Sequence, residues 1–331
     1  MRIQSLLFEN RLCNQKIASE PNLILVHPQT IGFTRFIRLI EKRQHPAWVY
    51  LMDSSFFCVR SYNLLPNAAE PCTLCLSKNT DPAQQNNCKP FPVDDNEAFD
   101  FIRMLSTFSD QGKVNFLVQN QKQYDLARIH FGSKPEIRVI GLWLDELDSI
   151  ISQRQAPTQN VTKKQYDVVF HGAPISAKGA HWALELATQC PSLGFYFPFS
   201  FTSLKLGSDI TVPANCTFEE STWETGLCEV VANSKITLVP SLWSAPIEGA
   251  LIKSLIAGRV VAIVENPSSF SSELPPDIVL TLPRNTAHAA TILSSAISNH
   301  WQPNPENLDK WIKNLISDNR HLLEKLDGLS R

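Results

Sequence analysis

The sequence lacks any long uninterrupted apolar run. No segment approaches the ~18 to 20 consecutive apolar residues that a membrane-spanning helix needs. Residues 1–16 carry charged and polar groups every few positions, so they do not form the apolar core of a signal peptide. We therefore expect a cytoplasmic protein with at most peripheral membrane contact.

An excess of charge of one sign is also lacking. The 30 Lys and Arg residues against 32 Asp and Glu give a net charge of −2, which creates no field that would gather nucleic acid. A content of 43% hydrophobic and 19% charged residues is ordinary for a soluble globular protein. Since 331 residues exceed the usual size of one hydrophobic core, two domains of roughly 150 residues each are expected.

The eight cysteines do not indicate disulfides, because a reducing cytosol favours core residues, metal ligands or catalytic thiols. Four of them stand alone and are interpreted as small core residues: Cys13, Cys190, Cys216 and Cys228. The other four cluster in the loop 58–92: Cys58, Cys72, Cys75 and Cys88.

The gap of two residues between Cys72 and Cys75 lets two thiolates hold one tetrahedral ion. The segment 63–92 is rich in Pro, Asn, Asp and Gln and offers little material for a core. A structural zinc bound by the four clustered cysteines is one prediction for this loop, and a loop of free thiols is the alternative. Four thiolates would leave no open position on the ion, so no catalytic metal is expected.

Short apolar runs alternate with segments of helical periodicity along the chain, as in a parallel sheet with crossover helices. Expected strands are 22–27, 47–52, 114–118, 137–140, 166–170, 195–199, 236–239 and 260–264. Expected helices are 34–42, 95–108, 121–131, 180–189, 222–233, 246–257, 287–298 and one or two amphipathic helices within 306–326.

The alternation fades between residues 145 and 164 into Ser, Gln, Pro, Asn and Thr, which is typical of an exposed linker. We therefore place an N-terminal domain at 1–155 and a C-terminal domain at 156–331. Both are expected to be α/β, each with a Rossmann-like parallel sheet.

Two loops of the second domain carry the most informative chemistry. The first is His171–Gly179, HGAPISAKG, which lies between a strand and a helix. Unpaired amides and the helix dipole favour an anion at such a place. Gly172 and Gly179 allow close backbone approach and Lys178 supplies a point charge. The alternative is that these residues only terminate the strand and start the helix.

The second loop lies in the segment Leu238–Gly258, which precedes the strand 260–264. It begins Pro240-Ser241 and leads into a helix that ends at a glycine, so it forms a βαβ unit. The loop is expected at the carboxyl edge of the sheet, where open α/β sheets bind their ligands.

This run resembles the donor-site segment of the retaining, sugar-nucleotide-dependent glycosyltransferases of the GT-B class (group 1 type). The resemblance covers about residues 166–275 and is only general over the first domain. It implies two Rossmann-like domains that face each other across a cleft. The implied reaction moves a sugar, as a retaining hexosyltransferase, from a nucleotide diphosphate sugar to a hydroxyl acceptor, glycan or lipid-linked, in polysaccharide or glycoconjugate synthesis.

The resemblance also implies roles for individual residues. The implied nucleotide-binding residues are Gly172, Lys178, Gly179, Pro240, Ser241, Glu248 and Gly249, and the implied catalytic residues are Asp53, Lys178 and Glu248. His27 and His171 are further candidates for contacts in the cleft. The chain departs from the family at two places: Lys253 stands where a second glutamate is expected, and Ala173 where the phosphate loop has an arginine.

Two other functions stay open. The departures suggest a binding or scaffold subunit of GT-B shape without activity. Because a fold does not fix the reaction, a sugar-nucleotide epimerase or hydrolase on the same fold is the other.

Overall fold

The computed structural model describes residues 23–65, 70–92, 96–144, 147–155, 166–205 and 212–327. The chain divides into two compact units. The first comprises Met1–Leu65, Cys72–Leu142 and His321–Arg331, and the second comprises Pro66–Pro71 and Trp143–Arg320. Within the described ranges, no helix is both long enough and apolar enough to cross a membrane.

The first unit is built on a four-stranded parallel sheet of order β1-β2-β3-β4. Its strands are β1 (Ile24–Val26), β2 (Ala47–Tyr50), β3 (Val114–Val118) and β4 (Ile137–Val139). Its helices are α3 (Pro28–Ile31), α4 (Phe33–Glu41), α5 (Asp81–Gln85), α6 (Glu97–Asp110), α7 (Gln121–Phe131) and α14 (Leu322–Asp327). The predicted parallel α/β architecture is therefore present in this unit.

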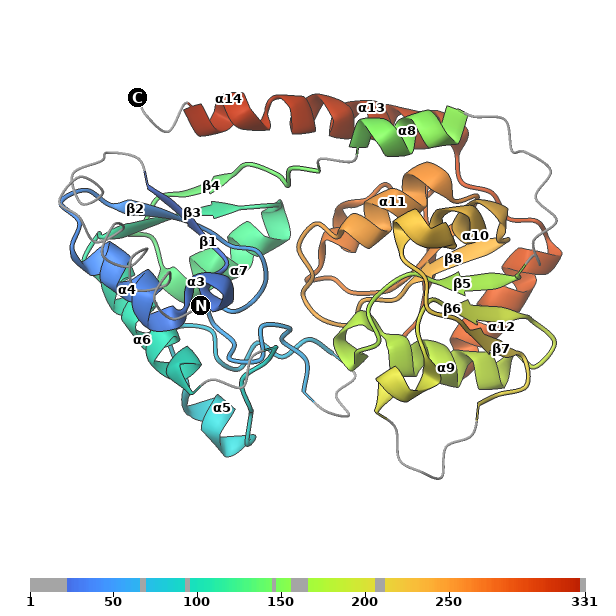
Figure 1. Cartoon of the computed structure of the whole chain (residues 1–331), viewed down its shortest axis with the longest axis horizontal. Coiled ribbons are helices and arrows are strands. Elements are labelled where there is room, and N and C mark those ends of the chain that lie inside the picture. The colour runs from blue at the N-terminus through green and yellow to red at the C-terminus, as the bar shows by residue number, and fades with distance from the viewer. Residues whose placement is uncertain are drawn as a thin grey trace. The chain divides into compact units, whose positions relative to one another are not determined.

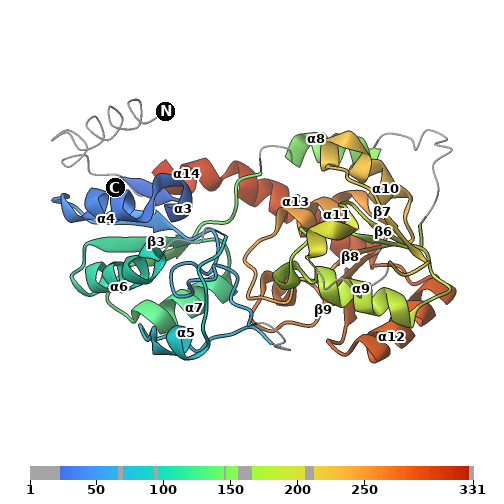
Figure 2. The same ribbon diagram turned by 60° about the horizontal axis from the view of Figure 1, so that its bottom comes forward.

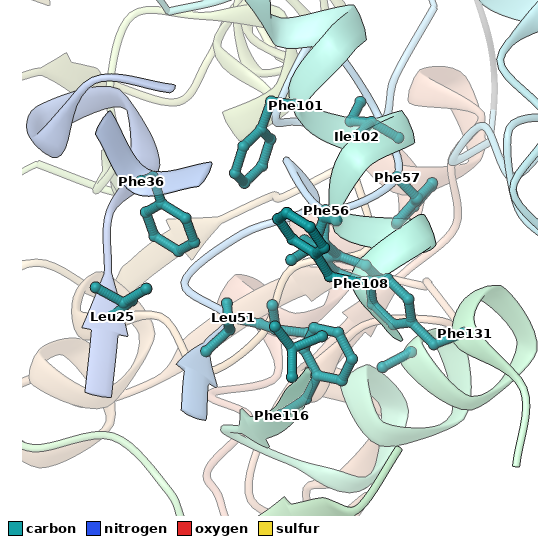
Figure 3. Packing of buried hydrophobic residues seen from close by; sticks show 14 of the residues in the cluster. Leu25, Phe36, Leu51, Phe56, Phe57, Phe101, Ile102, Phe108, Phe116 and Phe131 are labelled. Atoms are coloured by element: carbon teal, nitrogen blue, oxygen red, sulfur yellow. The ribbon is translucent and has the colours of Figure 1, made fainter. Parts of the chain in front are cut away.

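Aromatic side chains fill the core between this sheet and the helices α4, α6 and α7 (Figures 1 and 3). Phe116 of β3 stacks on Phe131 of α7 with ring centroids 3.9 Å apart and an interplanar angle of 16°. Phe101 of α6 meets the edge of Phe36 of α4 at 5.3 Å. Such buried rings supply much of the apolar surface that stabilises the unit.

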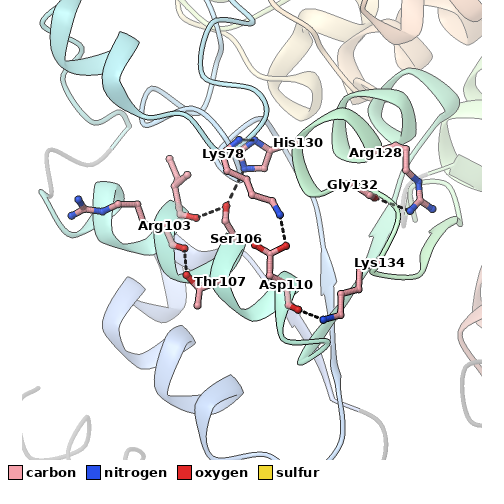
Figure 4. Close-up of polar contacts among 10 residues, drawn as sticks. Lys78, Arg103, Ser106, Thr107, Asp110, Arg128, His130, Gly132 and Lys134 are labelled. Carbon is pink, nitrogen blue, oxygen red and sulfur yellow. Dashed lines mark hydrogen bonds and ion pairs between the residues drawn. The ribbon is translucent and has the colours of Figure 1, made fainter.

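A buried histidine ties the cysteine loop to helices α6 and α7 (Figure 4). The Nδ1 atom of His130 accepts the Lys78 backbone N–H at 3.4 Å, and its Nε2 lies 3.3 Å from the Ser106 hydroxyl. The Lys78 side chain forms an ion pair with Asp110. Burial, with the Lys78 charge, lowers the pKa of His130 to about 4, so the ring is neutral at pH 7 and serves as structure.

The second unit contains a six-stranded, all-parallel sheet of order β10-β9-β8-β5-β6-β7. The strands are β5 (Val168–Phe170), β6 (Phe195–Phe197), β7 (Cys216–Phe218), β8 (Ile236–Val239), β9 (Val261–Val264) and β10 (Leu280–Leu282). The chain runs outward from β5 to β7, returns to the other side of β5 at β8, and runs outward again to β10. This is the doubly wound order, and it reverses between β5 and β8.

Helices cover both faces of this sheet (Figure 1). On one face lie α8 (Leu147–Gln155), α10 (Cys228–Asn233), α11 (Gly249–Ala257) and α13 (Pro305–Arg320). On the other face α9 (Ala180–Gln189) packs beside α12 (Thr286–Ser298) (Figure 2). Strand β5 supplies both cores, since Val168 and Phe170 face α9 and α12 while Val169 faces the α11 side. Because β5 is buried on both faces of the sheet, all three of its residues are apolar.

Four features of the second unit differ from the sequence-based expectation. Strands β7 and β10, of three residues each, were not predicted because such short runs carry little periodicity. Helix α8 lies in the stretch interpreted as a linker, since its polar sequence buries only Leu147 and Ile150 among the residues described. Helix α11 begins at Gly249 rather than Pro246, because the chain from Pro240 to Glu248 forms the loop.

We predict that Phe116→Ala lowers the free energy of unfolding by about 3–5 kcal/mol, because it leaves a cavity in the stacked core. The matched control is Ile129→Ala on α7, whose side chain is 56% exposed; it should change stability by no more than about 0.5 kcal/mol. Denaturant unfolding followed by near-UV circular dichroism measures both. Equal effects from the two variants would contradict the assigned packing.

Candidate functional site

The candidate site lies at the carboxyl edge of the second sheet, where the strand order reverses. The loop that follows β5 runs from His171 to Gly179, and the loop that follows β8 runs from Pro240 to Glu248. These are the two loops that flank the switch point. Open α/β sheets bind ligands in the crevice outside the carboxyl ends of such strands.

The two loops are held against each other by backbone contacts. The Leu242 N–H donates to Ala177 O at 2.9 Å, and the N–H of His171, where the first loop starts, donates to the O atom of Leu238 in strand β8 at 2.9 Å. Gly179 has φ +76°, and a Cβ there would lie 2.1 Å from the carbonyl oxygen of Pro240. Only glycine fits this position, because both the backbone angle and the neighbouring carbonyl exclude a side chain.

A buried ion pair joins the loops through their side chains. Lys178 pairs with the Oε1 atom of Glu248, which also accepts a 2.8 Å hydrogen bond from the Ser241 hydroxyl. The side chains of Lys178 and Glu248 are 20% and 8% exposed. The Lys178 ammonium also lies 5.0 Å from the centroid of the Trp243 ring. The lysine is therefore held at the switch point by a carboxylate and an aromatic face.

The N-terminus of α11 opens at the same loop. Glu248 is the N-cap residue, but its carboxylate makes no capping hydrogen bond to the helix, because it is bonded to Lys178 and Ser241. The first amides of a helix have no partner within the helix. A Cβ built on Gly249 would meet no atom within 4 Å. These amides and the positive end of the helix dipole can therefore receive an anion.

A second cluster lies beside this loop, where His171 follows β5. The Nδ1 atom of His171 is 2.8 Å from the Ser254 hydroxyl, and its ring stacks on Trp223 at 5.3 Å and 11°. The Lys253 ammonium lies 5.4 Å from the centroid of the same Trp223 ring. Burial, with the Lys253 charge, lowers the pKa of His171 to about 4. His171 is thus neutral at pH 7 and poorly suited to act as a general base there.

The structure brings most of the predicted nucleotide-binding residues to one place. Lys178 and Gly179 end the first loop, and Pro240, Ser241 and Glu248 belong to the second, with Gly249 starting the helix. Gly172 lies at the start of the first loop, where a Cβ would approach the Phe170 ring to 3.0 Å. Their roles in binding a nucleotide stay a prediction.

Two predicted residues belong to the first unit. Asp53 accepts a 2.8 Å hydrogen bond from the Ser55 N–H, which stabilises a local turn after β2. His27 precedes α3 with a left-handed backbone, φ +53°. Their catalytic or acceptor-side roles stay predictions.

Sequence reasoning missed three aromatic and hydroxyl partners of the site. Trp243 packs against Lys178, Trp223 against His171, and Ser254 bonds His171 across 83 positions of sequence. Trp243 stood inside the identified loop and could have been proposed as a cation–π partner. Trp223 and Ser254 gave no such signal, because only the fold brings their elements together.

The four clustered cysteines of the first unit line one pocket, which has Arg60 and Leu64 among its other lining residues. All four are free thiols. Burial, with the nearby cysteines, raises the pKa of Cys75 to about 11, and burial also raises the pKa values of Cys58 and Cys88. These three thiols are therefore protonated at pH 7 and are not activated nucleophiles.

The pocket does not support the predicted zinc site as it stands. Among the described residues, no three His, Cys, Asp or Glu side chains are gathered closely enough to hold a metal ion.

We predict that Gly179→Ala destabilises the second unit by more than about 2 kcal/mol, through backbone strain and the clash with Pro240. Gly249→Ala is the matched control, since its added Cβ meets no atom; its effect should stay within about 0.5 kcal/mol. Thermal and urea unfolding of the two variants measure the difference. A harmless Gly179→Ala would disprove the close approach of the two loops.

A second prediction concerns acid stability. Because the folded pKa of His171, about 4, lies below its unfolded value of ~6.5, protonation favours the unfolded chain as the pH falls below ~6.5. Protonation of His171 in the unfolded chain should therefore lower the free energy of unfolding by about 2 kcal/mol at pH 5 relative to pH 7.5. In His171→Asn this part of the pH dependence should vanish. Urea unfolding at both pH values provides the test, and an unchanged pH dependence would contradict a neutral, buried ring.

No family model and no curated protein sequence matches the chain. The fold is similar to that of solved glycosyltransferases. Sucrose-phosphate synthase from Thermosynechococcus elongatus has a TM-score of 0.63 at 11% identity, covering 98% of this chain and 77% of that chain. The Anabaena protein HepE in complex with UDP has a TM-score of 0.60 at 13% identity, covering 92% and 79%. Trehalose-6-phosphate synthase OtsA has a TM-score of 0.57 at 12% identity, covering 100% and 76%. The likeness confirms the predicted fold class of two parallel-sheet α/β domains, consistent with GT-B.

Proposed function

We propose that the protein is a glycosyltransferase that moves a sugar from a nucleotide diphosphate sugar to a hydroxyl acceptor. The observation that carries the proposal is the convergence of Lys178 and the N-terminus of α11 at the strand-order reversal. The fold-level likeness supports it, since HepE was solved with UDP and with UDP-glucose. A uridine diphosphate sugar is therefore the donor class to test first.

The diphosphate of the donor is the group that this site suits best. Lys178 supplies a positive charge, and the first amides of α11 supply hydrogen-bond donors at the positive end of a helix dipole. Departure of the diphosphate builds negative charge on its oxygens, and donors already fixed in place stabilise that charge as it forms. We assign these groups to leaving-group stabilisation, with no catalytic metal.

Binding of the diphosphate would add a partner to Lys178. Its ammonium has three N–H donors, so it can bond a phosphate oxygen while it stays paired with Glu248. Glu248 also keeps its hydrogen bond from Ser241. Its second oxygen can then accept a hydrogen bond from a ribose or sugar hydroxyl.

We assign Asp53 as a candidate base or acceptor-orienting group, and a glycan or lipid-linked hydroxyl as the acceptor. A retaining hexosyl transfer in polysaccharide or glycoconjugate synthesis follows from the family resemblance alone.

An inactive binding or scaffold subunit is the second candidate. It is favoured by Lys253, which occupies the position where the resembled family has a glutamate, and by Ala173 in place of the basic residue. A scaffold would bind UDP without transferring or hydrolysing any donor. An epimerase would convert the donor sugar without an acceptor, so product analysis with a panel of sugar nucleotides separates the three functions.

We predict that Lys178→Ala weakens UDP binding by roughly 10- to 100-fold, the range expected for one lost charge-assisted hydrogen bond. Isothermal titration calorimetry with UDP and UDP-glucose measures the change. The matched control is Lys235→Ala in the same unit, where Lys235 pairs with Asp167 at 2.7 Å and is 49% exposed. That variant should bind UDP as the parent protein does.

Loss of binding counts only if Lys178→Ala stays folded, which circular dichroism and thermal unfolding establish. The proposed donor site would be refuted if titration of the parent protein with uridine, guanosine and adenosine diphosphates gave no heat of binding. If Lys178→Ala bound UDP with the affinity of the parent protein, Lys178 would not be part of the donor site.

A further inference from the structure

Four cysteines of the first unit converge on one pocket that the proposed function does not use. Cys58, Cys72, Cys75 and Cys88 all line it, although they come from three different turns of the chain. Two of them are buried and two are partly exposed, and none forms a disulfide. A cluster of this kind concentrates four soft ligands at a single place.

The backbone that carries these cysteines is fixed by its own hydrogen bonds. The Cys72 N–H donates to Asn63 O at 2.7 Å, and the Asn63 side chain donates back to Cys72 O at 2.9 Å. The Cys88 N–H donates to Ala83 O at 2.8 Å, and the Ser61 N–H donates to Cys58 O at 3.0 Å. The backbone at Cys58, Cys72 and Cys88 is therefore held in place by hydrogen bonds within the loop.

The surroundings of the pocket suit a negatively charged cluster. The Nε atom of Arg60, another lining residue, is buried and has no hydrogen-bond partner among the described residues. A divalent ion held by four thiolates carries a net charge of about −2, which the Arg60 guanidinium would offset.

We propose that Cys58, Cys72, Cys75 and Cys88 bind one structural zinc ion in a tetrahedral site. No three of the described metal-binding side chains yet surround a common point, so binding must draw the sulfurs inward by side-chain rotation. The free energy of zinc–thiolate coordination is large compared with the cost of such rotations. Each thiol gives up its proton to solvent as its bond to zinc forms.

Zinc accounts for the cluster better than a disulfide does. A disulfide joins two sulfurs and would leave the other pair without a role, whereas a tetrahedral ion uses all four. The two-residue gap between Cys72 and Cys75 is the spacing with which one turn supplies two ligands to a zinc ion. Four sulfur ligands leave no open position, so the ion would stabilise the loop rather than take part in catalysis.

The test is the metal content of the full-length protein, purified from zinc-supplemented cells without chelators. Elemental analysis should find about one zinc ion per chain. The double variant Cys72→Ser/Cys75→Ser should retain less than about a tenth of that content. The matched control is Cys190→Ser, which removes a buried cysteine of the second unit and should keep its zinc.

A chelator titration of the parent protein covers the case in which the double variant does not fold. Removal of zinc should expose the four thiols to a thiol reagent and lower the melting temperature. Either of two results would overturn the proposal: a folded parent protein with less than about half an equivalent of zinc, or a mass deficit that reveals a disulfide within the cluster. Neither result bears on UDP binding, so this proposal and the proposed function fail separately.

Discussion

The close contact between the loops after β5 and β8 is the constraint on which the candidate site depends. The Cα of Gly179 lies so near the Pro240 carbonyl that no side chain fits between them. The two loops follow strands on either side of the order reversal, so their contact joins the two halves of the sheet at its carboxyl edge. It also fixes where the lysine before the glycine and the helix after the second loop can lie.

The buried ion pair between Lys178 and Glu248 also joins the two loops. A carboxylate that is 8% exposed is costly to bury, and the cost is offset only while a cation and a hydroxyl bond it. Lys178 and Ser241 perform this function in the structure. The neutral His171 beside them adds no further charge. The site thus holds its lysine in a defined place beside a neutral imidazole.

The architecture of both units could be predicted from the sequence because their strands are apolar runs separated by periodic helices, such as 166–170 and 180–189. The loops at the switch point could also be predicted, since glycine, proline and lysine mark them directly. Packing partners could not. The pairing of Lys178 with Glu248 spans 70 positions and that of His171 with Ser254 spans 83, and a one-dimensional pattern contains no information on which distant side chains meet. The short strand β7 and the polar helix α8 were not predicted for a different reason: each buries too few residues to create a periodic pattern in the sequence.

Helix α14 gives the first unit a discontinuous sequence. Leu326 of this helix packs against Trp48, Leu117 and Ile140 on one face of the first sheet, although nearly two hundred positions of the second unit intervene in the chain. During synthesis from the N-terminus, Leu326 reaches that apolar face only after the second unit has been made. A fragment cut after the first unit's strands would expose the same surface and be prone to association. Part of the cover of the first sheet is therefore supplied by a segment that follows the second unit in the sequence.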